Sequence, residues 1–191
     1  MSKKREIGTG KSQDILEKQA KHKSIYLSLG SNLSSSYGNR IDNLEIAQLL
    51  LLINNIFITK KSNYYETLSY PNKSHPKFIN CVIKVKSSYS PIKFLQIISS
   101  IEKFLGRKKT KKNYPRVCDI DIIDYKGKIL NFKNKKKKII KIPHINLHTR
   151  NFVLIPLLEI SPKWIHPVFK KNIKFFLSKL NNYGKNYINK V

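Results

Sequence analysis

Acidic residues are scarce in this sequence. It has 11 of them against 38 lysines and arginines, which gives a formal net charge of +27. Cysteine is scarcer still, with Cys81 and Cys118 as the only two. They lie far apart, and neither has a Cys or His partner at metal-ligand spacing, which argues against a disulfide scaffold and against a zinc module. This pattern predicts a reducing compartment, the cytoplasm.

Long hydrophobic runs are also missing. No apolar stretch approaches the roughly 20 residues that a membrane-crossing helix needs, so we expect no membrane partner. The first 23 residues carry charge without the apolar core of a secretory signal. We expect residues 1–23 to form a flexible basic extension. Residues 24–191 are expected to form a single domain, because a chain of 191 residues holds one sizeable core but hardly two.

Hydrophobic periodicity and turn residues predict alternating strands and helices beyond residue 24. Asn39 and Ser90 are candidate N-caps of two helices, and Gly106 is expected to end the second. Strands are expected at 25–29, 56–67, 78–85 and 117–125, and a last helix at 170–180. Strands that arrive in pairs between helices indicate a largely antiparallel sheet covered by helices, which is an α+β fold.

The few aspartates are clustered. Three of the five, Asp119, Asp121 and Asp124, fall within six residues in a predicted strand. Residues two apart on a strand point to the same face, so Asp119 and Asp121 project together, while Asp124 has the opposite parity and is expected in a turn. Two neighbouring carboxylates repel each other unless a cation lies between them. The pair is a candidate Mg²⁺ site, and a solvated sheet face is the alternative.

Arginine is rare among the basic residues, with five in the chain. Its planar guanidinium binds phosphate or carboxylate oxygens in pairs, which lysine cannot do. Arg107, Arg116 and Arg150 lie in the same third of the chain as the paired aspartates, and His144 is close to Arg150. Such a set is typical of sites that transfer phosphoryl groups. Zinc binding by His144 and His148 is disfavoured, because the Glu of the H-E-x-x-H motif is absent.

Six stretches, in this order along the chain, resemble the 6-hydroxymethyl-7,8-dihydropterin pyrophosphokinase family. They are LSLGSNL (27–33), YYET (64–67), HPKFINCV (75–82), IEKFLGRKK (101–109), PRVCDIDII (115–123) and IPHINLHTRNFVLIPLLEISP (142–162). The resemblance implies a ferredoxin-like α+β fold with three layers, α/β/α. It also implies Mg-dependent transfer of pyrophosphate from ATP to 6-hydroxymethyl-7,8-dihydropterin in folate biosynthesis, with release of AMP.

The resemblance further implies roles for individual residues. Asp119 and Asp121 would hold two Mg²⁺ ions, and Arg116 and His144 would act with them as catalytic residues. The ATP-binding residues would be Glu102, Arg107, Lys109, Arg116, Ile122, His144 and Arg150. The pterin would be bound by Thr67, Phe78, Asn80 and Phe152, with the two aromatic rings stacked on it. From the residues alone, both phenylalanines could equally be part of the core.

The chain departs from the family pattern in places. Lys109 stands where a second arginine is common, and NYPR at 113–116 lacks a usual glycine. The alternative function is a basic RNA-binding module, which the net charge and the lysine runs KKTKK and KNKKKK would suit. A compositional bias of the genome explains the lysines as well. We expect a monomer that binds small molecules and no specific nucleic acid.

Overall fold

The computed structural model describes residues 24–108, 114–133, 139–180 and 187–191. The expected extension 1–23, Lys109 and most of the KNKKKK stretch lie outside these ranges. Within them, no helix has both the length and the apolar character required to cross a membrane.

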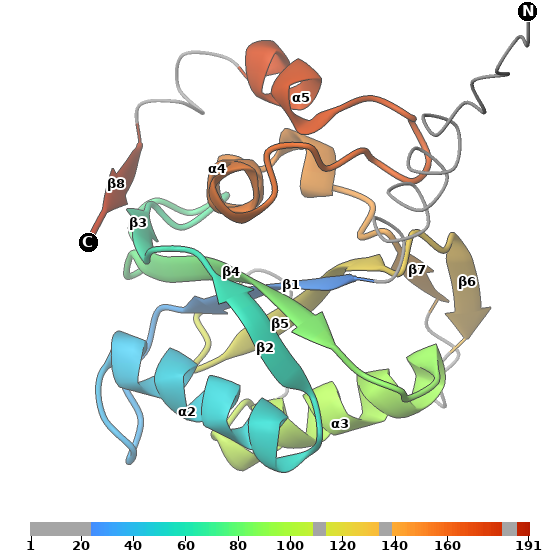
Figure 1. Ribbon diagram of the computed structural model, residues 1–191. Helices are drawn as coiled ribbons and strands as arrows, with labels where there is room; N and C mark the ends of the chain where they lie inside the picture. Colours follow the sequence, from blue (N-terminus) through green and yellow to red (C-terminus); the bar gives the residue numbers. More distant parts are fainter. Residues whose placement is uncertain (1–23, 109–113, 134–138, 181–186) are drawn as a thin grey trace, which may run out of the picture.

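A six-stranded antiparallel sheet forms the centre of the described molecule (Figure 1). Its strands are β1 (Ile25–Ser31), β2 (Phe57–Lys61), β3 (Tyr65–Thr67), β4 (Phe78–Lys86), β5 (Asp119–Tyr125) and β8 (Ile188–Lys190). β1 lies between β4 and β5 and pairs with both. β4 also pairs with β2 and β3, and β8 extends the sheet beyond β3.

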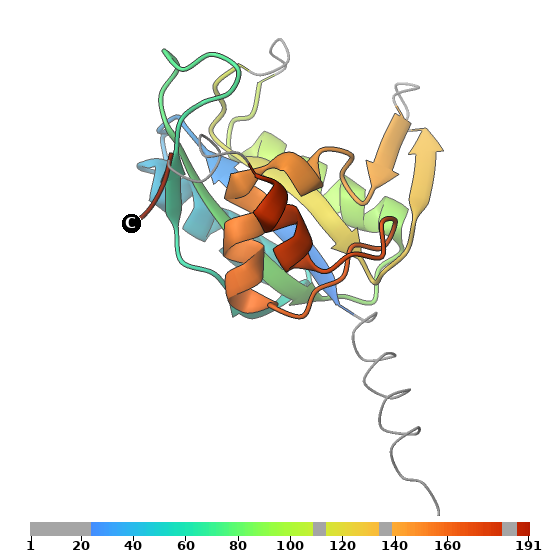
Figure 2. The ribbon, with the colours of Figure 1, turned by 90° about the horizontal axis from the view of Figure 1, so that it is seen from above.

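Helices cover both faces of the sheet, which gives three layers (Figures 1 and 2). On one face lie α2 (Arg40–Ile53) and α3 (Pro91–Phe104), and on the other lie α4 (Asn151–Ile160) and α5 (Ile173–Lys179). A separate hairpin of β6 (Leu130–Lys133) and β7 (Ile139–Ile142) leads to the 3₁₀ helix η1 (Leu147–Thr149). This arrangement is the three-layer α+β architecture that the sequence predicts.

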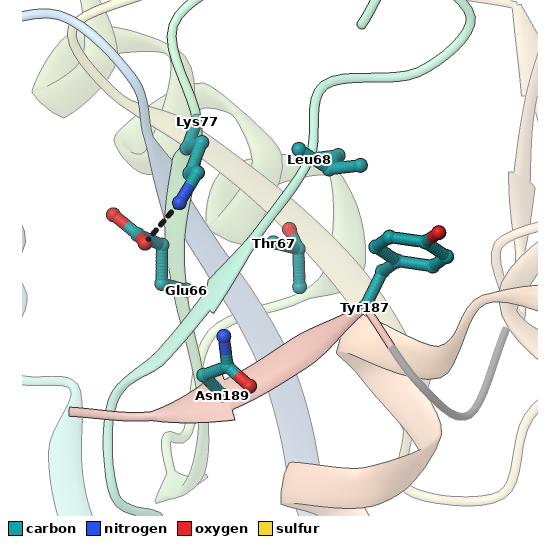
Figure 3. Close-up of a pocket in the computed structure, with 6 residues that line it drawn as sticks. All are labelled: Glu66, Thr67, Leu68, Lys77, Tyr187 and Asn189. Carbon is teal, nitrogen blue, oxygen red and sulfur yellow. Dashed lines mark hydrogen bonds and ion pairs between the residues drawn. The ribbon is translucent and has the colours of Figure 1, made fainter. Parts of the chain in front are cut away.

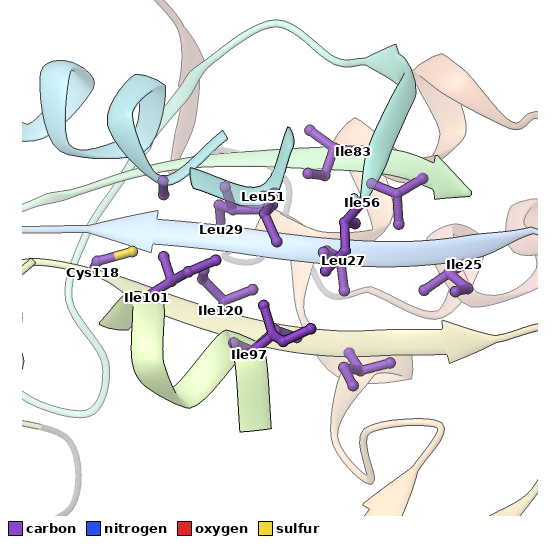
Figure 4. Close-up of a cluster of buried hydrophobic side chains, with 14 of the residues drawn as sticks. Ile25, Leu27, Leu29, Leu51, Ile56, Ile83, Ile97, Ile101, Cys118 and Ile120 are labelled. Atoms are coloured by element: carbon purple, nitrogen blue, oxygen red, sulfur yellow. The ribbon is translucent and has the colours of Figure 1, made fainter. Parts of the chain in front are cut away.

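Two hydrophobic clusters hold the layers together. The larger one fills the space between the sheet and α2 and α3, and includes Leu27 and Leu29 of β1 together with Ile97 and Ile101 of α3 (Figure 4). The smaller one lies between the sheet and α4 and α5, and includes Tyr26 and Val82. Every residue of β1 is buried, because this strand contributes to both clusters. Burial of one large aliphatic side chain contributes about 1.5–3 kcal/mol.

The predicted helix starts are confirmed. The Asn39 side chain accepts the N–H of Asp42, whose carboxylate in turn accepts the Asn39 N–H at 2.8 Å, so α2 begins with a capping box. Ser90 Oγ accepts the N–H of Lys93 at the start of α3. Gly106 has a φ of +94°, which favours glycine and ends that helix.

Two expectations about elements are wrong, and three short strands are not predicted. The segment 56–67 forms two strands, because Ser62 Oγ takes the N–H of Val82 and interrupts the pairing. The last helix begins at Ile173, since Lys170 has a φ of +54° and Asn172 provides the N-cap. Strands β6, β7 and β8 are not predicted from the sequence, because segments of three or four residues show too little alternation.

Candidate active site

Strand β5 presents Asp119 and Asp121 on the face of the sheet that α4 covers. Ile120 and Ile122 point the other way, into the cluster beneath α2 and α3. Ile122 is 6% exposed, so its side chain lies in the core and on the opposite face from the carboxylates. Of the predicted ATP-binding residues that the structure describes, it is the one whose side chain is directed away from the carboxylates.

Two guanidinium groups flank Asp119. Arg107 Nη1 lies 2.8 Å from Asp119 Oδ1, and Arg116 Nη1 donates to Oδ2 at 2.7 Å. Arg107 reaches the site from the segment after α3, whereas Arg116 precedes β5. Two arginines of the predicted phosphate-binding set, one after α3 and one before β5, therefore meet at one carboxylate.

Asp121 faces an arginine and a histidine. Arg150 Nη1 donates to Asp121 Oδ2 at 3.3 Å, and His144 Nε2 lies 3.9 Å from the same oxygen. Burial and the charge of Asp119 nevertheless raise the pKa of the Asp121 carboxyl, and they outweigh His144 and Arg150. Burial also lowers the pKa of His144. The local charge balance thus leaves room for a further cation at the two aspartates.

Glu102 approaches the same carboxylates from α3. It is 8% exposed, accepts the N–H of Ile120 at 2.8 Å and forms a salt bridge with Arg107. Burial raises the pKa of Glu102 to about 7, although the charge of Arg107 acts in the opposite direction. Glu102 therefore holds Arg107 in position beside Asp119.

Asp124 is separated from the other two aspartates by a β-bulge. The register of β1 and β5 shifts so that Ile123 has no opposite residue. Asp124 Oδ1 accepts the N–H of Gly127 at 2.8 Å, and Oδ2 accepts the N–H of Trp164 Nε1 at 2.9 Å. The turn role expected for Asp124 is confirmed. The expected opposite parity is wrong, because the bulge places Asp124 opposite Tyr26, on the same face of the sheet as Asp121, where it binds Trp164.

The predicted pterin-binding residues gather beside β1. Asn80 Nδ2 donates to Thr67 Oγ1 at 2.9 Å, which joins β4 to β3. In the sheet, Gly30 pairs with Asn80 on one side and with Asp119 on the other. A Cβ at Gly30 would lie 3.0 Å from Asn80 Oδ1 and 3.4 Å from the Phe78 ring. The absence of a side chain at Gly30 therefore lets both sets of predicted residues meet across β1.

Phe152 lies on another element, at the start of α4. It is half-buried and packs against the smaller hydrophobic cluster. The Arg150 guanidinium carbon lies 5.5 Å from the centre of the Phe152 ring. One short segment thus carries both a predicted phosphate-binding residue and a predicted pterin-binding residue.

Asn32 is a site residue that sequence reasoning missed. It is 2% exposed, and its Oδ1 accepts the N–H of Arg116 at 2.7 Å. Its Nδ2 donates to the carbonyl of Pro76 at 3.0 Å and to Ser69 Oγ at 3.3 Å. Asn32 therefore ties the loop after β3 to the segment that carries Arg116. The only signal in the sequence is an asparagine in the turn directly after a buried strand.

A small pocket of about 70 Å³ opens at the sheet edge between β3 and β8 (Figure 3). Its lining residues are Glu66, Thr67, Leu68, Lys77, Tyr187 and Asn189. Only Thr67 among them belongs to the predicted site. The pocket is therefore separate from the paired carboxylates.

Within the described ranges, no three His, Cys, Asp or Glu side chains are grouped closely enough to hold a metal by themselves. Asp119 and Asp121 still suit Mg²⁺, which proteins usually bind through one or two carboxylates together with substrate phosphates. A divalent cation would also offset the burial and the charge of Asp119, which raise the pKa of the Asp121 carboxyl.

Comparison with known proteins decides the family. Residues 26–162 match the family model described as 7,8-dihydro-6-hydroxymethylpterin-pyrophosphokinase (HPPK). The chain belongs to the HPPK family. The family and the enzyme class expected from the sequence are thereby confirmed.

Relatives in this family differ greatly in length. The 2-amino-4-hydroxy-6-hydroxymethyldihydropteridine pyrophosphokinase of Aquifex aeolicus is 38% identical over 152 residues, which are 80% of this chain and 89% of that protein. Folic acid synthesis protein fol1 of Schizosaccharomyces pombe is 35% identical over 175 residues, which are 90% of this chain and 23% of that protein. The chain thus spans less than a quarter of fol1.

Solved structures support the fold. The crystal structure of Plasmodium falciparum HPPK-DHPS A437G with pteroate matches with a TM-score of 0.68 at 16% identity. The match covers 87% of this chain and 46% of that chain. It bears on the fold alone, and the expected ferredoxin-like α+β class is confirmed.

Proposed function

We propose that this chain transfers pyrophosphate from ATP to the hydroxymethyl group of 6-hydroxymethyl-7,8-dihydropterin and releases AMP. The observation that carries the proposal is the pair of carboxylates, Asp119 and Asp121, enclosed by cationic groups and one strand away from Asn80. The cationic groups are Arg107, Arg116 and Arg150, and His144 lies beside them. We take Lys109, outside the described residues, as a further ATP-binding residue.

Charge complementarity explains how this set would receive ATP. The arginines and the aspartates now neutralise each other. A triphosphate accompanied by a divalent cation offers each set a new partner, the phosphates for the guanidiniums and the cation for the carboxylates. Asp119 and Asp121 would hold the two Mg²⁺ ions, which would supply charge neutralisation on the phosphates. Arg116 and Arg150 would then fix the phosphate chain by paired hydrogen bonds.

The proposed reaction needs no nucleophile from the protein. The substrate hydroxyl oxygen forms a bond to the β-phosphorus of ATP, and the bond from that phosphorus to the oxygen of AMP breaks. The hydroxyl proton is released. Catalysis then depends on positioning and on stabilising charge at the phosphate oxygens, which Arg107, Arg116 and His144 are placed to do.

The pterin would lie on the other side of Gly30. Phe78 and Phe152 would stack on its flat ring, and Asn80 and Thr67 would form hydrogen bonds to its edge. The hydrogen bond from Asn80 to Thr67 supports this role, because it fixes the orientation of the Asn80 amide.

We further propose that residues 24–191 work as one domain and as a monomer. The thiols of Cys81 and Cys118 are buried and form no disulfide. They support a reducing compartment such as the cytoplasm. No membrane or specific nucleic-acid partner forms part of this proposal.

The deciding experiment measures AMP released from ATP and Mg²⁺ with and without 6-hydroxymethyl-7,8-dihydropterin. We expect AMP, not ADP, and only when the pterin is present. Asp119→Asn and Asp121→Asn should each lower the rate by about 100-fold or more, because each removes a carboxylate charge that would hold the Mg²⁺ ions.

The matched control is Asp42→Asn, which makes the same chemical change in the capping box of α2. It should keep the wild-type rate. A folded wild-type chain that makes no pterin-dependent AMP would overturn the proposal. Salt-sensitive RNA binding would then be measured as the alternative activity.

A further inference from the structure

The segment that carries His144 and Arg150 is a short turn around η1. Leu147 N donates to the carbonyl of His144 at 3.0 Å, and Arg150 N donates to the carbonyl of Leu147 at 3.3 Å. Asn146 N also donates to His144 Nδ1 at 3.2 Å, which leaves Nε2 of that ring directed at Asp121. The placement of the His144 and Arg150 side chains therefore depends on the position of η1.

His148, in the middle of η1, is held by aromatic packing. Its ring centre lies 5.0 Å from that of Phe169, 6.1 Å from Phe176 and 6.2 Å from His166. Its Nδ1 atom is buried and has no hydrogen-bond partner among the described residues. The ring shape of His148, and not a hydrogen bond from Nδ1, thus fixes η1 against the segment that follows α4.

His166 makes that following segment rigid. It is 3% exposed, and its Nδ1 accepts the N–H groups of Val168 and Phe169 at 3.1 and 3.4 Å. Burial, with the charges of His148 and Lys170, lowers the pKa of His166 to about 4. At neutral pH His166 is uncharged, with its proton on Nε2, and can pack among aromatic rings without the cost of a buried charge.

Trp164 connects this packing to the strand of the carboxylates. Its ring centre lies 5.5 Å from that of His166, and its Nε1 donates to Asp124 Oδ2 at 2.9 Å. Asp124 stands three residues after Asp121 on β5. Continuous contacts thus run from β5 through Trp164, His166 and His148 to η1, and return to Asp121 through Arg150.

We propose that this histidine–aromatic cluster, formed by His148, Trp164, His166, Phe169 and Phe176, positions Arg150 and His144 against the paired aspartates. His148 is then a positioning residue for ATP that acts through Arg150. The inference rests on the proposed function, since it assigns a role in binding the phosphates of ATP. Four of the five members lie beyond residues 26–162, the part that matches the family model.

The first test compares two substitutions at one position. His148→Ala removes the ring, so η1 loses its packing and Arg150 shifts. We expect the KM for ATP to rise about tenfold, because small displacements of a binding group are costly. The KM for the pterin should rise less than the KM for ATP, because Thr67, Phe78 and Asn80 lie on β3 and β4 and only Phe152 is close to Arg150. His148→Phe keeps an aromatic ring, and His148 Nδ1 has no hydrogen bond to lose. This variant should therefore have the KM for ATP of the wild type.

A matched control separates positioning from general destabilisation. Leu51→Ala removes apolar volume from the other hydrophobic cluster, beneath α2. It should lower the melting temperature while leaving the KM for ATP unchanged. Emission of Trp164, the only tryptophan in the chain, reports whether the cluster is intact in each variant. An equal rise in the KM for ATP in Leu51→Ala and His148→Ala would overturn the proposal.

A double-mutant cycle tests the route of the effect. In an Arg150→Ala background, His148→Ala should change the KM for ATP by less than about twofold, because the group through which it acts is already missing. An undiminished tenfold effect in that background would show that His148 does not act through Arg150, and the proposal would fall.

The binding of a non-hydrolysable ATP analogue with Mg²⁺, measured by calorimetry, keeps this inference apart from the proposed function. If the wild-type chain makes no AMP but His148→Ala still weakens the binding of the analogue about tenfold, the positioning role stands and the proposed reaction falls. If AMP is made and His148→Ala binds the analogue as the wild type does, the reaction stands and the positioning role falls.

Discussion

Glu102 shows how much a single buried carboxyl group can influence the site. Its pKa is raised to about 7, chiefly by burial, while the charge of Arg107 and the N–H of Ile120 favour the ionised form. Both protonation states are therefore populated near neutral pH. In the unfolded chain the same group is ionised above pH 4.5, so folding takes up a proton between these two values.

We expect Glu102→Gln to remove a pH dependence of stability in the ligand-free chain. A raised acid pKa means that the wild type loses stability as the pH rises from about 4.5 to about 7. Glutamine has no such loss, and its side-chain oxygen can still accept the N–H of Ile120. The melting temperature of the variant, relative to wild type, should therefore rise across this window and stay level above it. Relative to wild type, the free energy of unfolding of the variant should increase across this window by on the order of 1–3 kcal/mol.

Glu45→Gln is the matched control, because the pKa of Glu45 is shifted in the opposite direction, downward. A hydrogen bond from Tyr64 is the main cause that lowers the pKa of Glu45. Its charge therefore contributes stability that is present at neutral pH and is lost as the pH falls through the folded-state pKa. The variant should be slightly less stable than wild type at pH 7. A pH-independent difference between wild type and Glu102→Gln would contradict the raised pKa.

At the scale of elements, strand parity was enough to predict the face of the site. Asp119 and Asp121 share a face as an alternating strand requires, and the caps at Asn39 and Ser90 depend on local chemistry alone. The bulge at Ile123 could not be predicted, because it depends on pairing with a strand almost a hundred residues earlier in the chain. The contacts of Asn32 were equally hidden, since all its partners are distant in sequence.

The close approach of three strands at Gly30 leads to an element-scale prediction. In Gly30→Ala, the new Cβ would lie 3.0 Å from Asn80 Oδ1 and 3.4 Å from the Phe78 ring, so β4 side chains must shift. We expect the KM for the pterin to rise about tenfold and stability to fall by about 1–3 kcal/mol. The KM for ATP should change less, because the three atoms nearest to the new Cβ belong to Asn80 and Phe78. Steady-state kinetics with each substrate varied in turn measures both constants.

The outcome that contradicts this prediction is specific. A rise in the KM for ATP with an unchanged KM for the pterin would mean that Gly30 serves the phosphate side and that Asn80 and Phe78 do not bind the pterin. Ser28→Ala is the control. Ser28 lies on β1 two positions before Gly30 and pairs with Asp121 of β5, and the substitution removes only its hydroxyl group. It should leave the KM for the pterin unchanged.

At the scale of the whole molecule, the net charge of +27 has two explanations. A compositional bias would scatter lysines without effect on the reaction, whereas a positive field would draw an anionic substrate toward the site. The two explanations predict different effects of salt on the binding of ATP. Exposed charges farther than about 8–10 Å from the ligand are screened at physiological ionic strength, but partly buried arginine contacts are screened much less.

We expect salt to slow the arrival of ATP and to leave its departure nearly unchanged. Between low salt and 0.5 M KCl, the association rate constant should fall about tenfold, because long-range steering by the lysines is lost. The dissociation rate constant should change less than about twofold, since the partly buried Arg116 and Arg150 hold the phosphates at short range. Stopped-flow mixing with a fluorescent ATP analogue measures both. An association rate that does not depend on salt would favour compositional bias, while a dissociation rate that rises with salt would place the phosphates on exposed lysines.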